Sequence, residues 1–277
     1  MPAFLEAALR DGIRHDGRGL MDYRDVDIEF GLADGTAIIS VGKTRVLAVV
    51  RAELVEPYMD RPQEGNVSFS VDLGGLASPH WEPGKQAVRA KTIASTIDQI
   101  FKSAGLIDTE ALCVMGGRKV WSIHCDVRAL QFDDNLEDAC ILSAVAAMKH
   151  FRRQDVTVDG DEVIVHDVEA RQPVGLCMHH VLAAVTFAYN AASAVFFVDP
   201  CSEEVSLISG KVTFVLNEQE MIVGILMPGG FLTDYESLES LQPLAKKLAQ
   251  GVIEKLLSAT RMEDERRQST RVHSVSK

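Results

Sequence analysis

The sequence predicts an α+β fold in which two strand-rich halves, each closed by a long helix, form one compact unit. The stretch from Trp121 to Met148 gives the main evidence, because it reads as a strand, an acidic turn and a buried helix in succession. From Trp121 to Ala129, apolar and polar residues alternate with the period of a half-buried strand. From Leu136 to Met148 nearly every residue is apolar, which indicates a helix enclosed by protein on all sides.

The first half contains further strands and a second helix. Residues 36–50 predict a hairpin around Gly42-Lys43-Thr44, and Val67–Leu73 alternate as a third strand. Pro83-Gly84 begins a helix that runs to about Ser103. The Gly-Lys-Thr run does not predict a phosphate-binding P-loop, because it lacks the earlier glycine and the following helix that this motif needs.

The second half repeats the pattern of hairpins and strands closed by a helix, which is a hint of internal duplication. Strands are expected at 156–158, 162–166, 181–189, 194–198, 212–216 and 221–226. A helix is expected from Thr233 to about Ser258, restarted or bent at Pro243, and the tail from Thr260 is expected to be polar and loose. The chain therefore divides into an N-terminal arm with a short helix (1–18), a first domain (19–150), a connector (151–178), a second domain (179–259) and a polar tail (260–277).

Composition limits the class of protein. The 277 residues are 47% hydrophobic and 25% charged, as is typical of a globular chain. We find neither a run of about 18 apolar residues nor a charged-then-apolar leader, so we expect an intracellular protein without a membrane span or a secretory signal. The five cysteines form no CxxC pair, which disfavours a zinc site. A net charge of −12 argues against a surface that binds nucleic acid all over, so any RNA contact must be local.

The turn before the central helix is strongly acidic. Its residues are Asp133, Asp134, Asn135, Leu136, Glu137 and Asp138. A helix N-terminus after a strand is a common place for an oxyanion, but carboxylates beside a phosphate repel it by about 4 kcal/mol per close pair. The favoured interpretation is that Asn135 caps the helix and Asp138 completes a capping-box-like pair. The alternative is an acidic metal site, for which the turn lacks a nearby histidine ligand.

Cations on the helix that begins at Pro83 are the candidate RNA contacts. They are Lys85, Arg89, Lys91 and Lys102. A solvated helical face is the more common explanation of such spread cations, and a track for RNA phosphates is the functional alternative.

Two groups of histidines are candidates for chemistry. His124 and Asp126 share the polar face of the central strand, and an interface or solvent role is favoured over a general-acid pair because no nucleophile accompanies them. His179 and His180 are adjacent, so their side chains point to opposite faces of a strand and cannot easily share a metal ion.

The last candidate is an acidic loop with Asp199, Glu203 and Glu204. A solvated turn is the favoured interpretation, and a divalent cation site is the alternative. The sequence predicts no cofactor site.

Several motifs resemble the RNase PH family in their order and spacing. They are Asp16-Gly17-Arg18 with Tyr23-Arg24, then Gly42-Lys43-Thr44-Arg45-Val46, then Glu82-Pro83-Gly84, then Asp199-Pro200-x-x-Glu203-Glu204. Within that family, Ile107–Trp121, His150–Val163 and His179–Val181 resemble ring subunits of the eukaryotic RNA exosome. The resemblance covers nearly the whole chain and implies an RNase PH, ribosomal-protein-S5-like fold in a six-membered ring that threads RNA through a central pore.

The same resemblance implies that catalysis has been lost. Active members hold phosphate with Gly, Ser or Thr, Arg and Thr at the start of the helix after the central strand. The corresponding positions here are Asn135, Leu136, Glu137 and Asp138. The position of the family's catalytic Asp corresponds to Ser209, and the paired Arg after Pro-Gly corresponds to Lys85 and Gln86.

The implied function is a non-catalytic structural subunit of the exosome core ring that supports 3′-to-5′ RNA processing and degradation, including that of rRNA. An active phosphate-dependent 3′-to-5′ exoribonuclease is the alternative, and a metal-dependent hydrolase is a more distant one. The implied partners are other RNase PH-like ring subunits, in a heterodimer within the ring, S1/KH-type cap subunits and RNA, with no membrane. The implied location is the nucleus, including the nucleolus, and the cytoplasm.

Overall fold

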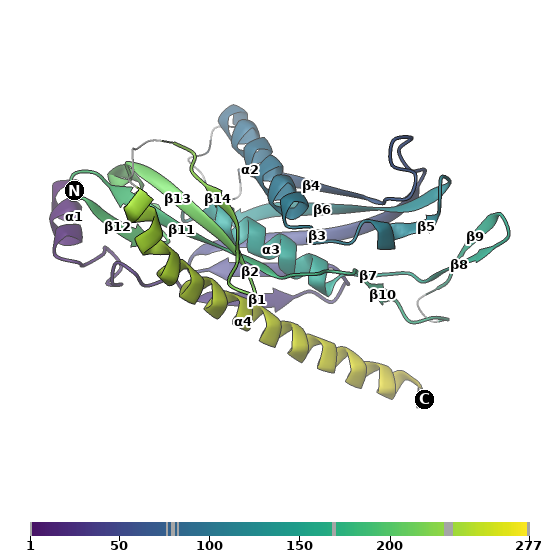
Figure 1. Ribbon diagram of the computed structural model, residues 1–277. Coiled ribbons are helices and arrows are strands. Elements are labelled where there is room, and N and C mark those ends of the chain that lie inside the picture. Colours follow the sequence, from purple (N-terminus) through teal and green to yellow (C-terminus); the bar gives the residue numbers. More distant parts are fainter. Residues whose placement is uncertain are drawn as a thin grey trace.

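Two β-sheets share one central helix, α3 (Leu136–His150), in the computed structural model of the chain (Figure 1). The structure describes residues 2–75, 77–78, 81, 83–167, 170–229 and 235–275. None of the helices within these ranges is both long and apolar enough to span a lipid bilayer.

The first sheet has six strands in the order β1-β2-β3-β6-β4, with β5 paired to β6. The strands are β1 (Val26–Phe30), β2 (Thr36–Val41), β3 (Thr44–Val55), β4 (Asn66–Asp72), β5 (Cys113–Met115) and β6 (Lys119–Gln131). The predicted hairpin is confirmed, because β2 and β3 pair antiparallel and Val41 faces Thr44 across the turn. The predicted alternation in β6 is also confirmed, since Ile123, Cys125 and Val127 are all buried.

The second sheet has four strands in the order β12-β11-β13-β14. The strands are β11 (Leu182–Asn190), β12 (Val195–Val198), β13 (Gly210–Asn217) and β14 (Ile222–Leu226). Between the sheets in sequence lie the hairpin β8 (Val156–Asp159) and β9 (Glu162–Val165) and the short pair β7 (Arg152–Arg153) and β10 (Val174–Gly175). Two short 3₁₀ turns, η1 (Glu110–Leu112) and η2 (Val205–Leu207), complete the connections.

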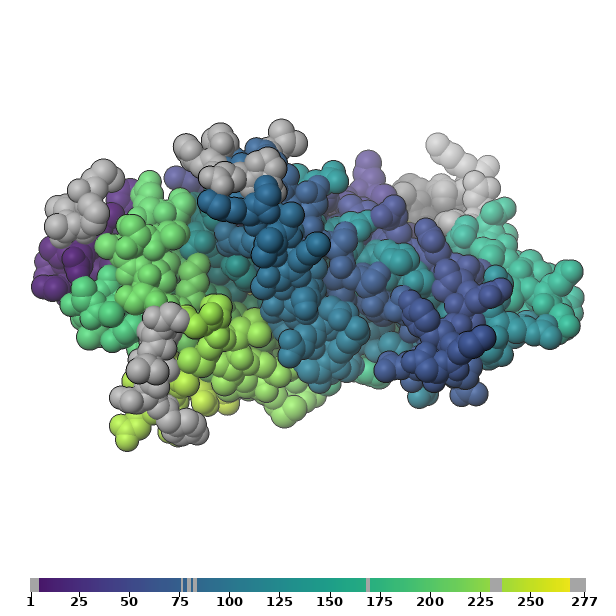
Figure 2. Space-filling model, turned by 90° about the horizontal axis from the view of Figure 1, so that it is seen from above, coloured from purple at the N-terminus to yellow at the C-terminus, as the bar shows by residue number. Residues whose placement is uncertain are grey.

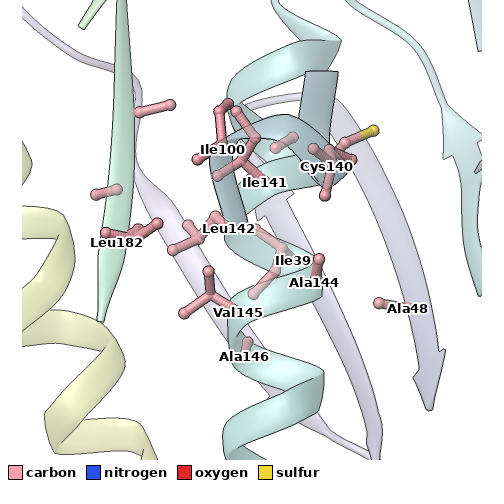
Figure 3. Close-up of a cluster of buried hydrophobic side chains, with 14 of the residues drawn as sticks. Ile39, Ala48, Ile100, Cys140, Ile141, Leu142, Ala144, Val145, Ala146 and Leu182 are labelled. Atoms are coloured by element: carbon pink, nitrogen blue, oxygen red, sulfur yellow. The ribbon is translucent and has the colours of Figure 1, made fainter. Parts of the chain in front are cut away.

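Helix α3 is enclosed, as its composition predicts. All of its residues are buried except Glu137 and Lys149, which are half-buried. Figure 3 shows Ile39 and Ala48 of the first sheet on one side of the helix and Leu182 of the second sheet on another. Because one apolar helix supplies core to both sheets, the two halves have a continuous hydrophobic core.

Helices α1 (Pro2–Arg10) and α2 (Pro83–Ser103) cover different parts of the molecule. Leu5 and Leu9 of α1 pack against Phe197 and Leu207, so the N-terminal helix lies on the second half rather than the first. Helix α2 packs against β4 and α3. Seen from above, α2 crosses the middle of the surface, between the second-half strands and the end that carries β8 and β9 (Figure 2).

Helix α4 (Tyr235–Val275) is longer than predicted, and it does not restart at Pro243 but continues through it. Pro243 is exposed, so water can reach the carbonyl group that loses its intrahelical partner. The tail from Thr260, expected to be loose, instead continues this helix. The predicted start at Thr233 lies outside the described residues.

Polar contacts with the first half and the connector explain why the end of α4 is held. Arg267 forms a 2.7 Å ion pair with Asp34 and donates to the carbonyl oxygen of His150 at 3.2 Å. Asp264 pairs with Arg152 at 3.1 Å. Composition alone could not predict this order, because the partners lie more than 100 residues away in the sequence.

Candidate functional site

The acidic turn before α3 lies where elements from both halves meet. Arg89 reaches it from α2, Lys211 from β13, and Arg24 from the segment before β1. Asp199, in the loop after β12, contacts it from the second half. The structure therefore brings the turn into contact with Arg89, one of the four predicted RNA-binding cations, and with Asp199 of the acidic loop.

The turn departs from the predicted capping arrangement. Asn135 stands at the N-cap position, but it has φ 43° and its side chain makes no capping hydrogen bond. A normal N-cap residue has an extended backbone that lets its side chain bend back to the helix N–H groups. Here the Asn135 Nδ2 instead donates to Asp138 Oδ2 at 2.9 Å and to Asp199 Oδ1 at 2.6 Å. The prediction of a cap was wrong in its bonding, and the amide bridges two carboxylates instead.

Asp138 is a buried anchor between α3 and β11. Its Oδ1 accepts from the Thr186 hydroxyl at 2.6 Å and its Oδ2 accepts from the Thr186 N–H at 2.9 Å. Burial raises the pKa of Asp138 to about 6, against the effect of these hydrogen bonds. Because its oxygens are engaged inside the protein, this carboxyl group joins the helix to the second sheet.

Glu137 and Asp134 form ion pairs with the cations beside the turn. Arg89 Nη2 lies 3.2 Å from Glu137 Oε1 and 3.9 Å from Asp134 Oδ1. Lys211 Nζ lies 2.7 Å from Asp134 Oδ2. Burial acts to raise the pKa of Glu137, but the charges of Arg89 and Lys211 outweigh it and hold that pKa below its ordinary value. The positive charge at this place is therefore matched by carboxylates of the same chain.

A cavity of about 370 Å³ lies beside these ion pairs, between α2, α3, β13 and β14. Arg89, Glu137 and Lys211 line it together with Thr186 and Thr213, and apolar residues such as Ile97, Ile141 and Ile225 supply much of the remaining lining. Leu136, the first residue of α3, is fully buried and does not line it.

Ser209 stabilises a turn. Its N–H donates to the carbonyl oxygen of Tyr189 at 2.8 Å, and its hydroxyl accepts from the Ala191 N–H at 3.0 Å. The side chain at this position therefore fixes the connection after β11, and a serine hydroxyl has no acidity near neutral pH for general-acid work.

The four cations predicted as RNA contacts do not form one patch. At about 1.5 Å per residue, Lys85 and Lys102 lie about 25 Å apart along α2. Lys85 and Lys91 are exposed, whereas Arg89 turns toward α3 and lies over the ring of Phe132. Lys102 pairs with Asp98 at 2.7 Å near the other end of the helix. Ion pairs hold Arg89 and Lys102, and an RNA track along α2 stays a prediction.

Two of the three acidic residues of the loop, Asp199 and Glu204, are buried, which corrects the expectation of a solvated turn for these two. Asp199 and Glu204 are 0% and 1% exposed. Arg24 binds Asp199 with two hydrogen bonds of 2.7 Å, and Arg14 forms an ion pair with Glu204. Burial acts to raise the pKa of Asp199, but the hydrogen bonds and charge of Arg24 outweigh it and hold that pKa below its ordinary value.

We call Arg14 and Arg24, with Asp199 and Glu204, the arginine clamp. It joins the N-terminal segment to the second half, and Arg18 adds a 3.3 Å contact to Asp199. Sequence reasoning missed its role, although Arg18, Arg24, Asp199 and Glu204 all stand in the motifs that resemble the RNase PH family. Glu203 remains at the surface, where it pairs with His15.

The other predicted candidates lie in ordinary polar contacts. His124 Nδ1 lies 2.6 Å from the Ser68 hydroxyl, and Asp126 Oδ1 accepts from the Ser70 hydroxyl at 2.6 Å on the same outer face of the sheet. Among the residues that the structure describes, no group of three or more His, Cys, Asp or Glu side chains is placed to hold a metal ion.

Comparison with known proteins identifies the family. The model of the 3′ exoribonuclease family, domain 1, matches residues 22–154, and the model of domain 2 matches residues 180–247. The chain is 39% identical over 229 residues to exosome complex component RRP45A of Arabidopsis thaliana, covering 82% of this chain and 75% of that protein. It is 38% identical to the human exosome complex component RRP45, with 83% of this chain covered but only 52% of the human protein.

Solved structures agree with the sequence comparisons. A structure described as the Archaeoglobus fulgidus exosome with RNA bound to the active site superposes with a TM-score of 0.80 at 27% identity, covering 91% of this chain and 96% of that one. An archaeal exosome core structure gives a TM-score of 0.75 at 25% identity, with 92% and 95% covered. The sequence matches and the shared two-sheet fold together establish that the chain belongs to the RNase PH-like 3′ exoribonuclease family, and within it to the RRP45-type exosome components.

Proposed function

We propose that this chain is a non-catalytic structural subunit of the exosome core ring, which supports 3′-to-5′ RNA processing and degradation by other subunits. The observation that carries the proposal is the pairing of Asp134 and Glu137 with Lys211 and Arg89 at the start of α3. A phosphorolytic enzyme must hold inorganic phosphate next to the RNA end, and a site whose cations face carboxylates offers little net attraction to a phosphate.

The test is a phosphorolysis assay. The purified chain is incubated with 3′-hydroxyl RNA and inorganic phosphate, and we expect no release of nucleoside diphosphates. Phosphate-dependent release would contradict the proposal and establish the alternative, an active 3′-to-5′ exoribonuclease. Release that needs Mg²⁺ but no phosphate would instead indicate a hydrolase.

The proposed partners are other RNase PH-like ring subunits, S1/KH-type cap subunits and RNA, in the nucleus, including the nucleolus, and in the cytoplasm. The names of the relatives support membership of the complex. Strand β14 supports a protein contact, because it is an edge strand flanked by the exposed side chains of Met221 and Met227 and carries exposed Ile225.

Co-expression tests the partner assignment. We expect the chain to self-associate when expressed alone and to form a soluble heterodimer with an RNase PH-like ring subunit, since obligate interfaces bury about 2,000 Å² or more with apolar centres. A monodisperse monomer with no affinity for any ring subunit would contradict it.

The RNA contribution is assigned to Lys85 and Lys91, because these predicted contacts are exposed. Replacing both with Ala in the reconstituted ring should lower RNA affinity and flatten its salt dependence by about 0.7 in log–log slope for each RNA phosphate that is no longer neutralised. The matched control replaces Lys246 and Lys247 of α4, which removes the same charge from another element. Equal effects of the two double variants would leave α2 with no specific place in the RNA path.

A further inference from the structure

Strand β4 is an edge of the first sheet that lacks the usual protection of an edge strand. Among the described residues it pairs with β6 alone, and Figure 1 shows it as the outermost strand, beside α2. Its seven residues, Asn66–Asp72, include neither lysine nor proline, and its register with β6 runs without a bulge. Alternate residues of an edge strand point both the N–H and the C=O group away from the sheet. A regular edge of this kind is a template on which another strand can pair.

The chain covers the opposite edge of the same sheet with its own elements. Strand β1 packs against α4, and Lys255 of α4 forms an ion pair with Asp25, next to β1. Helix α2 instead packs on the core face of β4, where the rings of Phe69 and Phe101 lie 4.6 Å apart. The two edges therefore differ, because a helix of the chain lies along β1, whereas a cavity lies beside β4.

That cavity has a volume of about 720 Å³ and lies between β4, the last turns of α2 and the loop that joins β3 to β4. Asn66 and Val67 point to opposite faces of the sheet, yet both line the cavity, so it reaches the edge of the strand itself. Phe69, Phe101 and Ile107 contribute apolar lining. The volume lies within the range of about 300–1,000 Å³ that is usual for binding pockets, and apolar lining favours an apolar side chain as the occupant.

The loop between β3 and β4 presents large side chains to solvent at the rim of the cavity. Tyr58 lines the cavity and is 65% exposed, and Met59 beside it is fully exposed. Tyrosine and methionine are enriched in surfaces that bind other proteins. The rim therefore has the composition of a protein contact.

The same rim carries more carboxylates than cations. Asp60, Glu64 and Asp98 line the cavity with Arg61 and Lys102. Both cations are paired already, since Arg61 Nη1 lies 3.5 Å from Glu64 Oε2 and Lys102 Nζ lies 2.7 Å from Asp98 Oδ2. The Asp60 side chain is 77% exposed and has only a 4.0 Å contact to Arg61. The surplus negative charge repels an RNA phosphate and attracts a cation.

We propose that the edge of β4 binds an extended, basic segment of a partner protein as an added strand. Main-chain hydrogen bonds to β4 supply affinity, and side chains at alternate positions of the segment supply specificity. An apolar side chain of the segment enters the cavity, and a lysine or arginine lies against Asp60 and Glu64. The inference goes beyond the proposed function, because this surface lies away from the start of α3 and serves a catalytic and a non-catalytic chain alike.

The first test measures main-chain protection in the full chain. The probe is an amidated heptapeptide that alternates valine with lysine, and hydrogen–deuterium exchange is followed by mass spectrometry. At a free peptide concentration of twice Kd, exchange of the newly bonded amides in residues 66–72 should slow about threefold, because the unbound fraction falls to a third. Exchange in the edge strand β12 should not change. The same peptide with a central proline cannot donate at that position and should protect β4 less.

The outcomes of the exchange measurement are distinct. If exchange in residues 66–72 is unchanged, or slows equally with the proline peptide, strand addition at β4 is overturned. If a single-stranded RNA oligonucleotide slows exchange there and the basic peptide does not, the surface belongs to RNA and the inference is equally overturned. A phosphorolysis result of either kind bears on the proposed function alone.

The second test reverses the charge of the rim. In Asp60→Lys with Glu64→Lys, both at exposed side chains, affinity for the labelled basic peptide in fluorescence anisotropy should fall by about fivefold or more. A peptide that alternates valine with glutamate should gain affinity. The matched control, Glu239→Lys with Glu254→Lys, makes the same change of net charge on exposed positions of α4 and should keep the wild-type affinity. Equal losses in the two double variants would mean that overall charge alone attracts the peptide, which overturns the inference.

Discussion

Removing one arginine from the arginine clamp should destabilise the protein strongly. The Arg14 and Glu204 side chains are 0% and 2% exposed. Arg14 also donates to the carbonyl oxygens of Val198 at 2.6 Å and Asp199 at 3.0 Å. In Arg14→Met, the apolar replacement fills part of the space, but Glu204 is left as a buried charge that still accepts from the Cys201 N–H at 3.1 Å.

The expected cost follows from that uncompensated charge. Removing one partner of a buried ion pair costs about 3–5 kcal/mol of the free energy of unfolding. The double variant Arg14→Met with Glu204→Met removes both charges and leaves only neutral backbone groups without partners, at about 1–3 kcal/mol. The double variant should therefore be more stable than Arg14→Met alone, and the two effects should be far from additive.

Urea unfolding followed by far-UV circular dichroism measures these differences, with all proteins at one concentration. For Arg14→Met the midpoint should fall by about 1–2 M urea. The control is Arg128→Met, which breaks a 3.0 Å pair with Asp72 whose side chains are 62% and 55% exposed, and which should cost less than about 1 kcal/mol. The reasoning is refuted if Arg14→Met lowers the free energy of unfolding no more than this control does. It is also refuted if the loss in the double variant equals the sum of the losses in Arg14→Met and Glu204→Met.

Two further predictions concern the contact between the C-terminal end of α3 and the turn that joins β1 to β2. Burial and the nearby Arg267 lower the pKa of His150 to about 4, and its Nδ1 accepts the Gly35 N–H at 3.1 Å. The folded state therefore favours neutral His150. Its contribution to the free energy of unfolding, up to about 3 kcal/mol, is fully present above about pH 6.5 and is lost as the pH falls from there through 4. His150→Asn keeps an acceptor for the Gly35 N–H and should make the free energy of unfolding less dependent on pH between about 6.5 and 4. If the pH dependence of the variant equals that of the wild type, His150 is not its source. Gly35→Ala should cost more than about 3 kcal/mol, because its Cβ would stand 2.6 Å from a Phe151 ring carbon at φ +82°, whereas Gly160→Ala, in open space at φ +60°, should cost about 1 kcal/mol. Thermal unfolding of both variants checks this, and equal losses would mean that backbone strain rather than the clash decides the cost.

The sequence predicts the elements of this protein better than it predicts the contacts between their ends. Helix α3 could be recognised as enclosed, because its residues are apolar in every direction and no surface helix tolerates that pattern. The acidic loop could not be recognised as buried, because the partner of Glu204 stands 190 positions earlier. Asp199 likewise depends on Arg24, 175 positions away. Local composition reads such residues as solvated, since carboxylates are rarely buried unless paired.

The acidic turn illustrates the same limit at the candidate site. The position of the N-cap could be predicted at Asn135, because Asn is favoured there. Its left-handed backbone could not be predicted, and neither could the contacts of the turn with Asp199, Arg89 and Lys211, which belong to other elements. The resemblance to a family singled out Glu137 without indicating that it forms an ion pair with Arg89 of α2.

The arginine clamp also limits when the N-terminal segment can dock during synthesis at the ribosome. Glu204 is synthesised 190 residues after Arg14. At about 5–20 residues per second, roughly 10–40 s pass before the two can meet. Throughout that time the N-terminal arginines have no buried carboxylate to bind and remain in water or in contact with whatever anion is near. Closure of the N-terminal segment over the second half must therefore be a late event in synthesis, and an amino-terminal fusion that hinders it should reduce the yield of folded chain even though it leaves both sheets intact.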